Sequence, residues 1–570
     1  MEGFPLTQPI YNKRDITDFK DLLNQSAGIY GNKNAFLLKG IMGEYTGIRY
    51  KDLKKDVEAL GTEFINMGLK HEKIAVLGEN RYEWCLTYLA TTAGTGTIVP
   101  LDKELPANEL RYLLEVSKVR AIVFSAKYKD KVAEAVAGLH ELKYFINMDL
   151  AEDEAGCLSF NKILKKGNNL IKIGDKKFIN AKVDPEEPTI LLFTSGTTGL
   201  AKGVMLSQRN ICSDIVYTSQ VVNVTEEDTI LSILPLHHTY ECTVSFLLML
   251  YNGATISFCE GLKHIVQNLK EVKPTVMIAV PLIYENMYKK IWEQAKKTGR
   301  AEKLQKGLKI SNMLRKVNVD MRKKFFADIL DTFGGNIRLA IAGGAASKPE
   351  VLKGLQDMGF FVIQGYGLTE ASPIAFVNQV DYYKNASIGL ALPGVEAQVH
   401  DPDASGIGEI WVKGNIVMQG YYENEEATKK TLTSDGWLKT GDLGYVDKDG
   451  FYYITGRKKN VIVTKNGKNI FPEEVESYLN DSPIIKESMV YGKEVEGELE
   501  PQVYAKIVPD YDEIRNSTGT FNLSADEIRK MIAEQVKKAN RKMPTYKAVK
   551  QFEIQETEFA KTTTHKIKRY

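Results

Sequence analysis

The stretch Thr189-Ile-Leu-Leu-Phe-Thr-Ser-Gly-Thr-Thr-Gly-Leu-Ala-Lys-Gly203 joins a short apolar run to a loop rich in glycine, threonine and serine. The run Thr189–Phe193 is typical of a buried strand. In the loop, the glycines permit backbone conformations that a side chain would block, the hydroxyl groups offer hydrogen-bond donors, and Lys202 supplies a cation. This combination indicates a cradle for a polyphosphate. A glycine-rich turn without a ligand is the alternative, because such motifs also occur by chance.

The loop differs from the phosphate-binding loop of kinases and GTPases. That motif has glycine directly before its lysine and serine or threonine directly after it. Here Ala201 precedes Lys202 and Gly203 follows it. The sequence therefore predicts a polyphosphate site of another type.

Short apolar runs alternate with helical patterns on both sides of this loop. The runs that predict strands are Lys73–Leu77, Arg120–Phe124, Thr189–Phe193, Thr275–Val280, Arg338–Ala342 and Phe360–Gln364, and Tyr82–Thr92 predicts a helix. This alternation predicts an α/β fold with mostly parallel sheets covered by helices. Ligands of such sheets bind where loops leave the carboxyl ends of strands. The glycine-rich segments expected at those ends are Ser195–Gly203, Gly343–Ser347 and Gly365–Glu370.

The chain is long enough for more than one domain, with 570 residues. Beyond Gly456–Lys459 it becomes more charged, and Ala525–Asn540 predicts an amphipathic helix. We therefore expect a large α/β domain over residues 1–456 and a small α+β domain over residues 457–570.

Composition excludes several classes of function. The net charge of +2 argues against a strong overall attraction to nucleic acid, which we do not expect as a partner. Residues 1–15 lack the pattern of a signal peptide, and Val244–Phe258 is too short and too interrupted to span a bilayer, so it predicts a buried helix and strand. The cysteines are scattered, which argues against a disulfide framework and fits the cytoplasm; they are Cys85, Cys157, Cys212, Cys242 and Cys259.

Five motifs, in this order, resemble those of the adenylate-forming superfamily, which includes acyl-CoA synthetases, firefly luciferases and the adenylation domains of nonribosomal peptide synthetases. The motifs are Thr194–Val204 (TSGTTGLAKGV), Gln364–Glu370 (QGYGLTE), Asp435–Asp442 (DGWLKTGD), Gly456–Lys459 (GRKK) with Asn466–Ile470 (NGKNI), and Lys561–Ile567 (KTTTHKI). The resemblance implies a ligase that activates a carboxylic acid as its acyl-AMP, releases pyrophosphate, and passes the acyl group to a thiol.

The resemblance also implies sites for ATP and Mg²⁺. Glu370 would bind Mg²⁺ together with Thr194, Tyr366 would lie against adenine, and Asp442 with Arg457 would bind the ribose. A core position for Tyr366 and an ordinary salt bridge between Asp442 and Arg457 are the alternatives. The residues expected to bind ATP are Thr194, Ser195, Gly196, Thr197, Thr198, Gly199, Lys202, Gly343, Gly344, Ala345, Gln364, Gly365, Tyr366, Gly367, Thr369, Asp442 and Arg457.

Lys566 is the expected catalytic residue of the first step, because a lysine can neutralise charge that builds on the α-phosphate and the attacking carboxylate. The family usually has glycine before this lysine, where this chain has His565. His238 matches a family histidine near the acyl carboxylate, whereas His237 does not, and hydrogen-bonded packing is the alternative for both. The sequence contains no HExxH or comparable cluster, so no transition metal is expected. Lys459 falls at the hinge about which the small domain of the family turns between the two half-reactions.

Two segments bear on the identity of the carboxylic acid and of the thiol that accepts the acyl group. The stretch Asp435–Lys459 resembles the signature of long-chain fatty acyl-CoA synthetases, so we expect a medium- to long-chain fatty acid and coenzyme A. An aryl or short-chain acid, a carrier protein as acceptor, and a non-enzymatic ATP-binding protein are the alternatives. The segment Lys289–Lys324, where long-chain members tend to carry an amphipathic insert, contains thirteen basic and three acidic residues. It predicts either a peripheral contact with the inner membrane face or a solvated helix face.

Overall fold

The computed structural model describes residues 7–154, 156–194, 201–463, 469–495, 501–520, 523–561, 567 and 569. Contacts within the chain divide it into two units. The first comprises Met1–Ala397 and Val412–Leu438, and the second comprises Gln398–Trp411 and Lys439–Tyr570. The expected boundary at residue 456 lies within strand β21 (Tyr452–Arg457) of the second unit. A hinge at this boundary stays a prediction.

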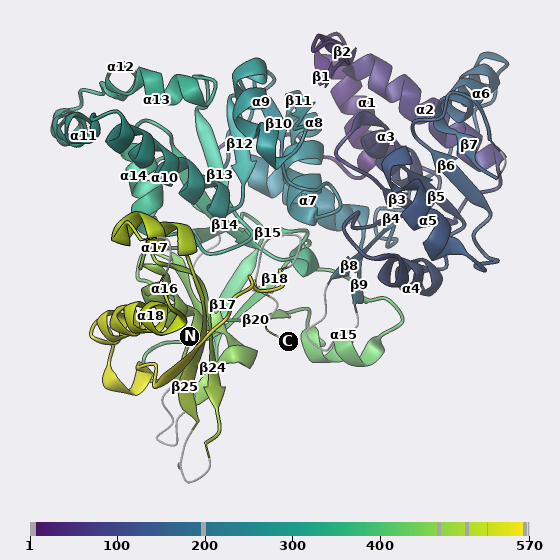
Figure 1. Cartoon of the computed structure of the whole chain (residues 1–570). Coiled ribbons are helices and arrows are strands. Elements are labelled where there is room, and N and C mark those ends of the chain that lie inside the picture. The colour runs from purple at the N-terminus through teal and green to yellow at the C-terminus, as the bar shows by residue number, and fades with distance from the viewer. Residues whose placement is uncertain are drawn as a thin grey trace. The chain divides into compact units, whose positions relative to one another are not determined.

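A nine-stranded sheet forms one half of the first unit (Figure 1). Its order is β16-β15-β14-β13-β12-β10-β11-β1-β2. Neighbours from β14 to β1 are parallel, and the strands added at either end are antiparallel. The strands are β1 Asn34–Lys39, β2 Tyr45–Arg49, β10 Thr229–Ser232, β11 Thr255–Phe258, β12 Val276–Ala279, β13 Leu339–Ala342, β14 Val362–Gly367, β15 Ile374–Val377 and β16 Leu390–Ala391.

An eight-stranded sheet forms the other half, in the order β19-β9-β8-β4-β3-β5-β6-β7. It is parallel from β8 to β7, and β9 and β19 add antiparallel pairs. The strands are β3 Lys73–Leu77, β4 Thr97–Pro100, β5 Ala121–Phe124, β6 Tyr144–Asn147, β7 Leu158–Ser159, β8 Ile190–Thr194, β9 Lys202–Leu206 and β19 Gly420–Tyr421.

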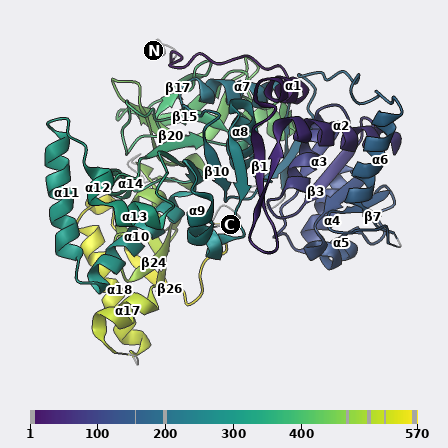
Figure 2. The ribbon, with the colours of Figure 1, turned by 90° about the horizontal axis from the view of Figure 1, so that it is seen from above.

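Helices cover these sheets, as Figures 1 and 2 show. Every residue of β5, β12 and β13 is buried, which is why these strands are continuous apolar runs. The helices are α1 Phe19–Tyr30, α2 Tyr50–Asn66, α3 Tyr82–Thr92, α4 Ala107–Ser117, α5 Lys129–Val136, α6 Phe160–Lys172, α7 Gln208–Ser219, α8 Leu248–Asn252, α9 Ile265–Val272, α10 Pro281–Lys297, α11 Ala301–Arg315, α12 Arg322–Phe325, α13 Ala327–Thr332, α14 Pro349–Asp357 and α15 Glu425–Thr431, with a π-helical segment η2 at Tyr240–Leu247.

The second unit is an α+β structure. Val475, Val490, Ile507 and Ile532 are among the buried residues of its core. One sheet contains β17 Glu396–His400, β18 Gly408–Lys413, β20 Leu438–Val446 and β21; another contains β24 Ile485–Lys493, β25 Gln502–Pro509 and β26 Gln551–Ile554; β22 Ile462–Val463 pairs with β23 Asn469–Ile470; and the helices are α16 Pro472–Asn480, α17 Tyr511–Thr518 and α18 Ala525–Asn540.

The expected fold class is confirmed, with two local differences. Strand β14 runs on to Gly367 instead of ending at Gln364, because it pairs with the antiparallel strand β15. The basic segment at residues 289–324 contains breaks between helices, at Gly299 and Asn318, which have φ of 68° and 59°. Residues 244–258 form the expected buried helix and strand. In the described part of the chain, no helix has the length and apolar content to cross a bilayer.

Candidate active site

The hairpin of β8 and β9 carries the first group of expected site residues. Thr194 pairs with Lys202 across the hairpin, and the Thr194 hydroxyl lies 3.5 Å from the Lys202 carbonyl oxygen. Gly203 is part of β9, opposite Phe193, so the loop is shorter than the Ser195–Gly203 segment expected from sequence. The expected ATP contacts that fall outside the described residues are Ser195, Gly196, Thr197, Thr198 and Gly199.

Tyr421 connects Lys202 to Glu370. The backbone of Tyr421 pairs with Val204 of β9, two residues after Lys202. The Lys202 ammonium group lies 5.0 Å from the centre of the Tyr421 ring. The Tyr421 hydroxyl donates a hydrogen bond of 2.9 Å to Oε1 of Glu370, whose carbonyl oxygen accepts one from the Met418 N–H at 2.9 Å. One tyrosine therefore holds a cation and a carboxylate that the sequence places in separate motifs.

The carboxyl ends of β13 and β14 lie side by side because these strands are parallel neighbours. Gln364 is buried and joins two loops: its Oε1 accepts a hydrogen bond from the Ser347 N–H at 2.9 Å, and its Nε2 donates to the Ser387 carbonyl oxygen at 3.2 Å. The half-buried Tyr366 ring meets Phe376 edge to face at 5.9 Å. Contacts of Gln364, Gly365, Tyr366, Gly367 and Thr369 with ATP stay predictions.

The glycines after β13 serve different purposes. A Cβ at Gly343 would lie 2.7 Å from Cζ of Tyr240, so the missing side chain makes room for that ring. The Tyr240 hydroxyl donates a hydrogen bond of 3.2 Å to the Ile341 carbonyl oxygen of β13. Gly344 has φ of 82°, a conformation that favours glycine. Ala345 is exposed. The predicted approach of adenosine to these three residues is untested.

The adjacent histidines occupy different environments. Their ring centres lie 4.2 Å apart, with His237 buried and His238 half-buried. Burial, followed by the nearby positive charge of Lys103, lowers the pKa of His237 to about 3. His237 is therefore neutral near pH 7, and its Nε2, 3.5 Å from Oδ1 of Asp102, has no hydrogen-bond partner among the described residues. This fits packing for His237, while the role of His238 near the acyl carboxylate stays a prediction.

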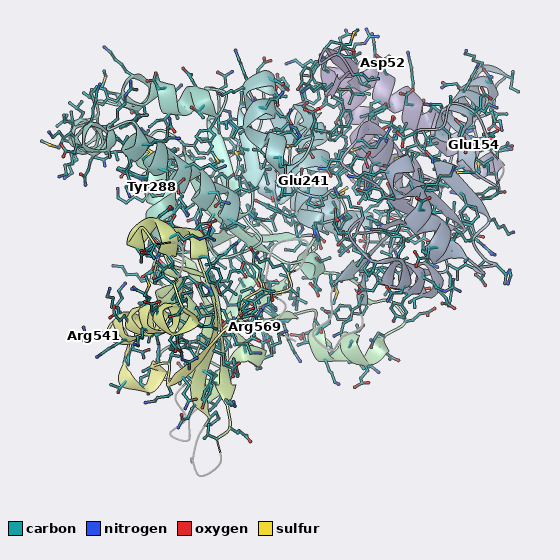
Figure 3. All side chains as sticks on the ribbon, in the orientation of Figure 1. Asp52, Glu154, Glu241, Tyr288, Arg541 and Arg569 are labelled. Carbon is teal, nitrogen blue, oxygen red and sulfur yellow. The ribbon has the colours of Figure 1, made fainter. Side chains whose placement is uncertain are left out.

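A buried polar network supports the segment that bears the two histidines. Glu241 is fully buried near the start of η2 (Figure 3). The Ser232 hydroxyl donates to its Oε1 at 2.6 Å, and the Ser245 hydroxyl to its Oε2 at 2.9 Å. Asn80 donates to Ser232 Oγ at 2.9 Å and accepts from the Leu236 N–H at 3.1 Å. Burial raises the pKa of Glu241 to about 8. This network therefore holds the start of η2, which follows the histidine pair in the sequence, in the buried interior.

In the second unit, Asp442 and Arg457 stand opposite each other on β20 and β21. Arg457 Nε lies 2.7 Å from Oδ1 of the buried Asp442. The salt bridge considered as an alternative is thus present, and contact with a ribose stays a prediction. The next residue, Lys458, pairs with Glu409 at 2.9 Å.

The expected hinge residue Lys459 lies in a single turn, Lys458–Asn460, directly after β21. Burial lowers the pKa of Lys459, and the positive charges of Arg457 and Arg569 lower it further. The expected catalytic Lys566 and its neighbour His565 lie outside the described residues.

Two family models together cover most of the chain. One, described as AMP-binding enzyme, matches residues 23–422. The other, described as AMP-binding enzyme C-terminal domain, matches residues 459–570. This chain is an AMP-binding enzyme.

Several relatives of this AMP-binding enzyme are similar over most of their length. It is 28% identical to the long-chain-fatty-acid–CoA ligase FadD15 of Mycobacterium bovis, over 93% of this chain and 91% of the relative. It is 29% identical to human long-chain-fatty-acid–CoA ligase 1, over 82% of this chain and 70% of the relative.

Solved structures share its fold. The anthranilate CoA ligase AuaEII in complex with anthranoyl-AMP matches with a TM-score of 0.75 at 20% identity, over 99% of this chain and 96% of that one. The o-succinylbenzoate coenzyme A synthetase MenE of Bacillus subtilis, in complex with ATP and a magnesium ion, matches with a TM-score of 0.72 at 22% identity, over 96% of this chain and 98% of that one. At such identities the matches show the fold alone.

The donor atoms of this AMP-binding enzyme fit Mg²⁺ bound together with a nucleotide. Within the described ranges, no group of three or more His, Cys, Asp or Glu could hold a metal ion. Glu370 and Thr194 offer a carboxylate and a hydroxyl, which are the hard oxygen ligands that Mg²⁺ prefers. Mg²⁺ usually takes one or two protein oxygens and completes its shell with phosphate and water, so a dedicated cluster is not required.

Sequence reasoning missed Tyr421, Asn80 and Glu241. Tyr421 is one of two adjacent tyrosines outside every recognised motif, and nothing in its spacing indicates contact with Glu370. Glu241 follows the histidine pair closely, but a carboxylate at that position is usually solvated. Only the pairing of β19 with β9 and the burial of η2 reveal these roles.

Proposed function

We propose that this AMP-binding enzyme is an acid–thiol ligase, which activates a medium- to long-chain fatty acid as its acyl-AMP and transfers the acyl group to coenzyme A. The observation that carries the proposal is the Lys202–Tyr421–Glu370 contact beside Thr194. This contact brings a cation, a carboxylate and a hydroxyl group to the β8–β9 hairpin. The loop that connects these two strands is rich in glycine, serine and threonine, as expected of a phosphate-binding loop.

The first step needs such a site because two anions must meet. The fatty acid carboxylate attacks the α-phosphorus of ATP, an oxygen–phosphorus bond forms, and the bond to the pyrophosphate leaving group breaks. Positive charge and hydrogen-bond donors stabilise the charge on the phosphoryl oxygens. Lys202 and the loop after Thr194 would hold the pyrophosphate, and Lys566 would neutralise the attacked phosphate. Mg²⁺, bound through Glu370 and Thr194, would neutralise phosphate charge.

The second step is transfer to the thiol. The coenzyme A sulfur attacks the acyl carbon, a thioester bond forms, and AMP leaves with the electron pair of the broken acyl–phosphate bond. Coenzyme A is supported by the names of the relatives FadD15 and human long-chain-fatty-acid–CoA ligase 1. A carrier protein with a thiol is the competing acceptor.

The same two names support the choice of acid. Each buried methylene contributes about 0.8 kcal/mol, so a dry tunnel would favour longer chains strongly. An aromatic acid is the second candidate, because AuaEII and MenE act on anthranilate and o-succinylbenzoate while sharing the fold.

A panel of carboxylic acids tests the proposal. The full chain is mixed with ATP, Mg²⁺ and acetate, benzoate, octanoate or palmitate, and AMP and pyrophosphate are measured with and without coenzyme A. We expect octanoate and palmitate to exceed acetate and benzoate, with acyl-CoA formed when coenzyme A is present.

Three results would overturn parts of the proposal. ADP and orthophosphate as products would contradict the assignment of the β8–β9 loop. A preference for benzoate or acetate would replace the fatty acid by the second candidate or by a short-chain acid. A thioester that forms only on an added carrier protein would replace coenzyme A as acceptor.

A further inference from the structure

The end of helix α11 and the residues after it expose a cluster of large apolar side chains. Ile310, Met313 and Val317 are 51%, 69% and 67% exposed, and Val319 and Phe325 are each 43% exposed. We call Ile310, Met313 and Val317 the α11 apolar patch, and Val319 and Phe325 follow it in the sequence. Ile310, Met313 and Val317 follow the spacing i, i+3 and i+7, which places them on one face of the helix and of the turn that continues it.

Other residues of α11 attach the helix to the rest of the first unit. Ser311 is buried, and a Cβ on Gly307 would lie 3.6 Å from the ring of Phe326. Arg315 Nη1 lies 3.3 Å from Oδ1 of Asp357 on α14. Figures 1 and 2 both show α11 at the margin of its unit. The α11 apolar patch is therefore not needed to hold the helix in place, and an exposed cluster of this kind marks an interaction surface.

Exposed lysines surround the patch. Lys303 and Lys306 continue the same helix face toward the amino end, because they precede Ile310 by seven and four residues. The others flank the patch, and the exposed lysines are Lys303, Lys306, Lys309, Lys316, Lys323 and Lys324. Residues 289–324 carry a net charge of +10, whereas the whole chain carries +2. The rest of the protein is therefore acidic, and the positive charge is concentrated here.

We propose that the α11 apolar patch and its lysines dock onto an anionic lipid bilayer. The apolar side chains would enter the boundary between headgroups and acyl chains, while the lysines contact lipid phosphates. Charge complementarity selects this occupant. A second copy of the chain would bring another set of lysines against the first, and like charges oppose such pairing. Docking requires no nucleotide or acid, so it stands apart from the proposed ligase reaction.

Vesicle co-sedimentation of the full chain tests the proposal without ATP or acid. Vesicles of phosphatidylcholine mixed with phosphatidylglycerol are compared with vesicles of phosphatidylcholine alone. We expect binding to the mixed vesicles, weakened by added salt, and little binding to phosphatidylcholine. Lys306→Glu with Lys309→Glu should weaken binding by about 25-fold or more, since each basic residue near an anionic surface contributes about fivefold. Met313→Ser with Val317→Ser should weaken it by about tenfold or more.

Two matched controls lie elsewhere in the first unit. Ile41 and Met42, at the β1–β2 turn, are 107% and 92% exposed, so Ile41→Ser with Met42→Ser removes exposed apolar surface outside the patch. Lys165→Glu with Lys172→Glu reverses two exposed charges on α6. Both controls should bind like the wild type.

Four outcomes would overturn the proposal. The wild type could fail to bind the mixed vesicles, or it could bind both kinds equally. The controls could weaken binding as much as the patch variants do. In sedimentation velocity, the patch variants could dissociate a dimer that the wild type forms, which would make the patch an interface between copies. The panel of carboxylic acids tests the ligase reaction, and vesicle co-sedimentation tests docking. A failure of the ligase reaction would therefore not affect the conclusion about docking.

Discussion

Tyr421 makes two separable contacts in the candidate site. Its hydroxyl donates to Glu370, and its ring lies beneath the Lys202 ammonium group. Tyr421→Phe removes the first contact and keeps the second. Because Glu370 would then lose a donor that orients its carboxylate, we expect the Mg²⁺ concentration for half-maximal pyrophosphate release to rise by about tenfold, the scale of one hydrogen bond.

The neighbouring tyrosine is the control for this variant. The Tyr422 ring contacts a different lysine, with the Lys73 ammonium group 5.3 Å from its centre. Tyr422→Phe should leave the Mg²⁺ dependence unchanged. An unaltered Mg²⁺ titration in Tyr421→Phe would show that Glu370 does not need this hydrogen bond.

Glu241 predicts a pH dependence of stability. Its pKa rises from 4.5 in the unfolded chain to about 8 in the folded protein because the carboxyl group is buried. The folded state therefore binds a proton more tightly than the unfolded state. This contribution to stability is fully present below pH 4.5 and is lost as pH rises to about 8. Its steepest slope is about 1.4 kcal/mol per pH unit.

Glu241→Gln removes this titration while keeping the shape of the side chain and its acceptor for Ser232 or Ser245. Melting temperatures of the wild type and the variant are measured between pH 5 and pH 8. We expect the wild type to lose stability relative to Glu241→Gln as the pH rises. Parallel curves would mean that Glu241 keeps an ordinary pKa in the folded protein.

Helix α16 and strand β24 are joined by a residue near the carboxyl end of the sequence. This residue is Arg569, which is labelled in Figure 3. Arg569 donates to both carboxylate oxygens of Glu476, at 2.6 and 2.5 Å, and to the Val490 carbonyl oxygen at 2.8 Å. The Val490 N–H donates to Glu476 at 2.6 Å. Burial raises the pKa of Glu476 to about 7, so its negative charge depends on compensation.

Arg569→Ala should destabilise the second unit by about 3 kcal/mol, because a largely buried carboxylate loses its cation. Hydrogen exchange of the full chain measures the effect, which we expect as faster exchange of the amides of α16 and β24. Arg569→Ala combined with Glu476→Gln should recover part of the protection, since the unpaired charge is then removed. Exchange that rises equally in the first unit would indicate general unfolding instead.

The proposed ligase must carry out two reactions, and a turn of residues 457–570 about Lys459 is the hypothesis for how it does so. Under that hypothesis Lys566 serves acyl-AMP formation alone. Lys566→Ala should lower this step by about two to three orders of magnitude, the scale for one transition-state charge stabiliser. The same variant should convert supplied acyl-AMP and coenzyme A to acyl-CoA near the normal rate. Equal loss in both steps, in a variant with a normal melt, would contradict the hypothesis.

Lys459→Pro should have the opposite effect, because proline restricts the backbone at the expected hinge. We expect acyl-AMP formation to be spared and thioester formation to slow, measured in the same two half-reactions. Lys459→Ala is the control, since it removes the charge and leaves the backbone free. If Lys459→Ala slowed thioester formation as much as Lys459→Pro, the ammonium group rather than backbone rotation would be responsible.

Local patterns in the amino-acid sequence were enough to predict strand β3, helices α3 and α18, the α/β class and the family motifs. Burial periodicity and glycine spacing are properties of neighbouring residues, so they can be read from a single segment. The sequence also indicates the salt bridge of Asp442 and Arg457 as an alternative to ribose binding, since both residues lie in recognised motifs.

Other features depended on segments that meet only after folding. Tyr421 reaches Glu370 because β19 adds to the edge strand β9, and Glu241 is buried because η2 lies within the first unit. The α11 apolar patch is exposed because other residues of that helix, such as Ser311, are the ones that pack on neighbouring elements. Each of these depends on long-range pairing and on which face of an element is covered. Sequence periodicity can indicate that a face is apolar, but only the tertiary structure decides what lies against it.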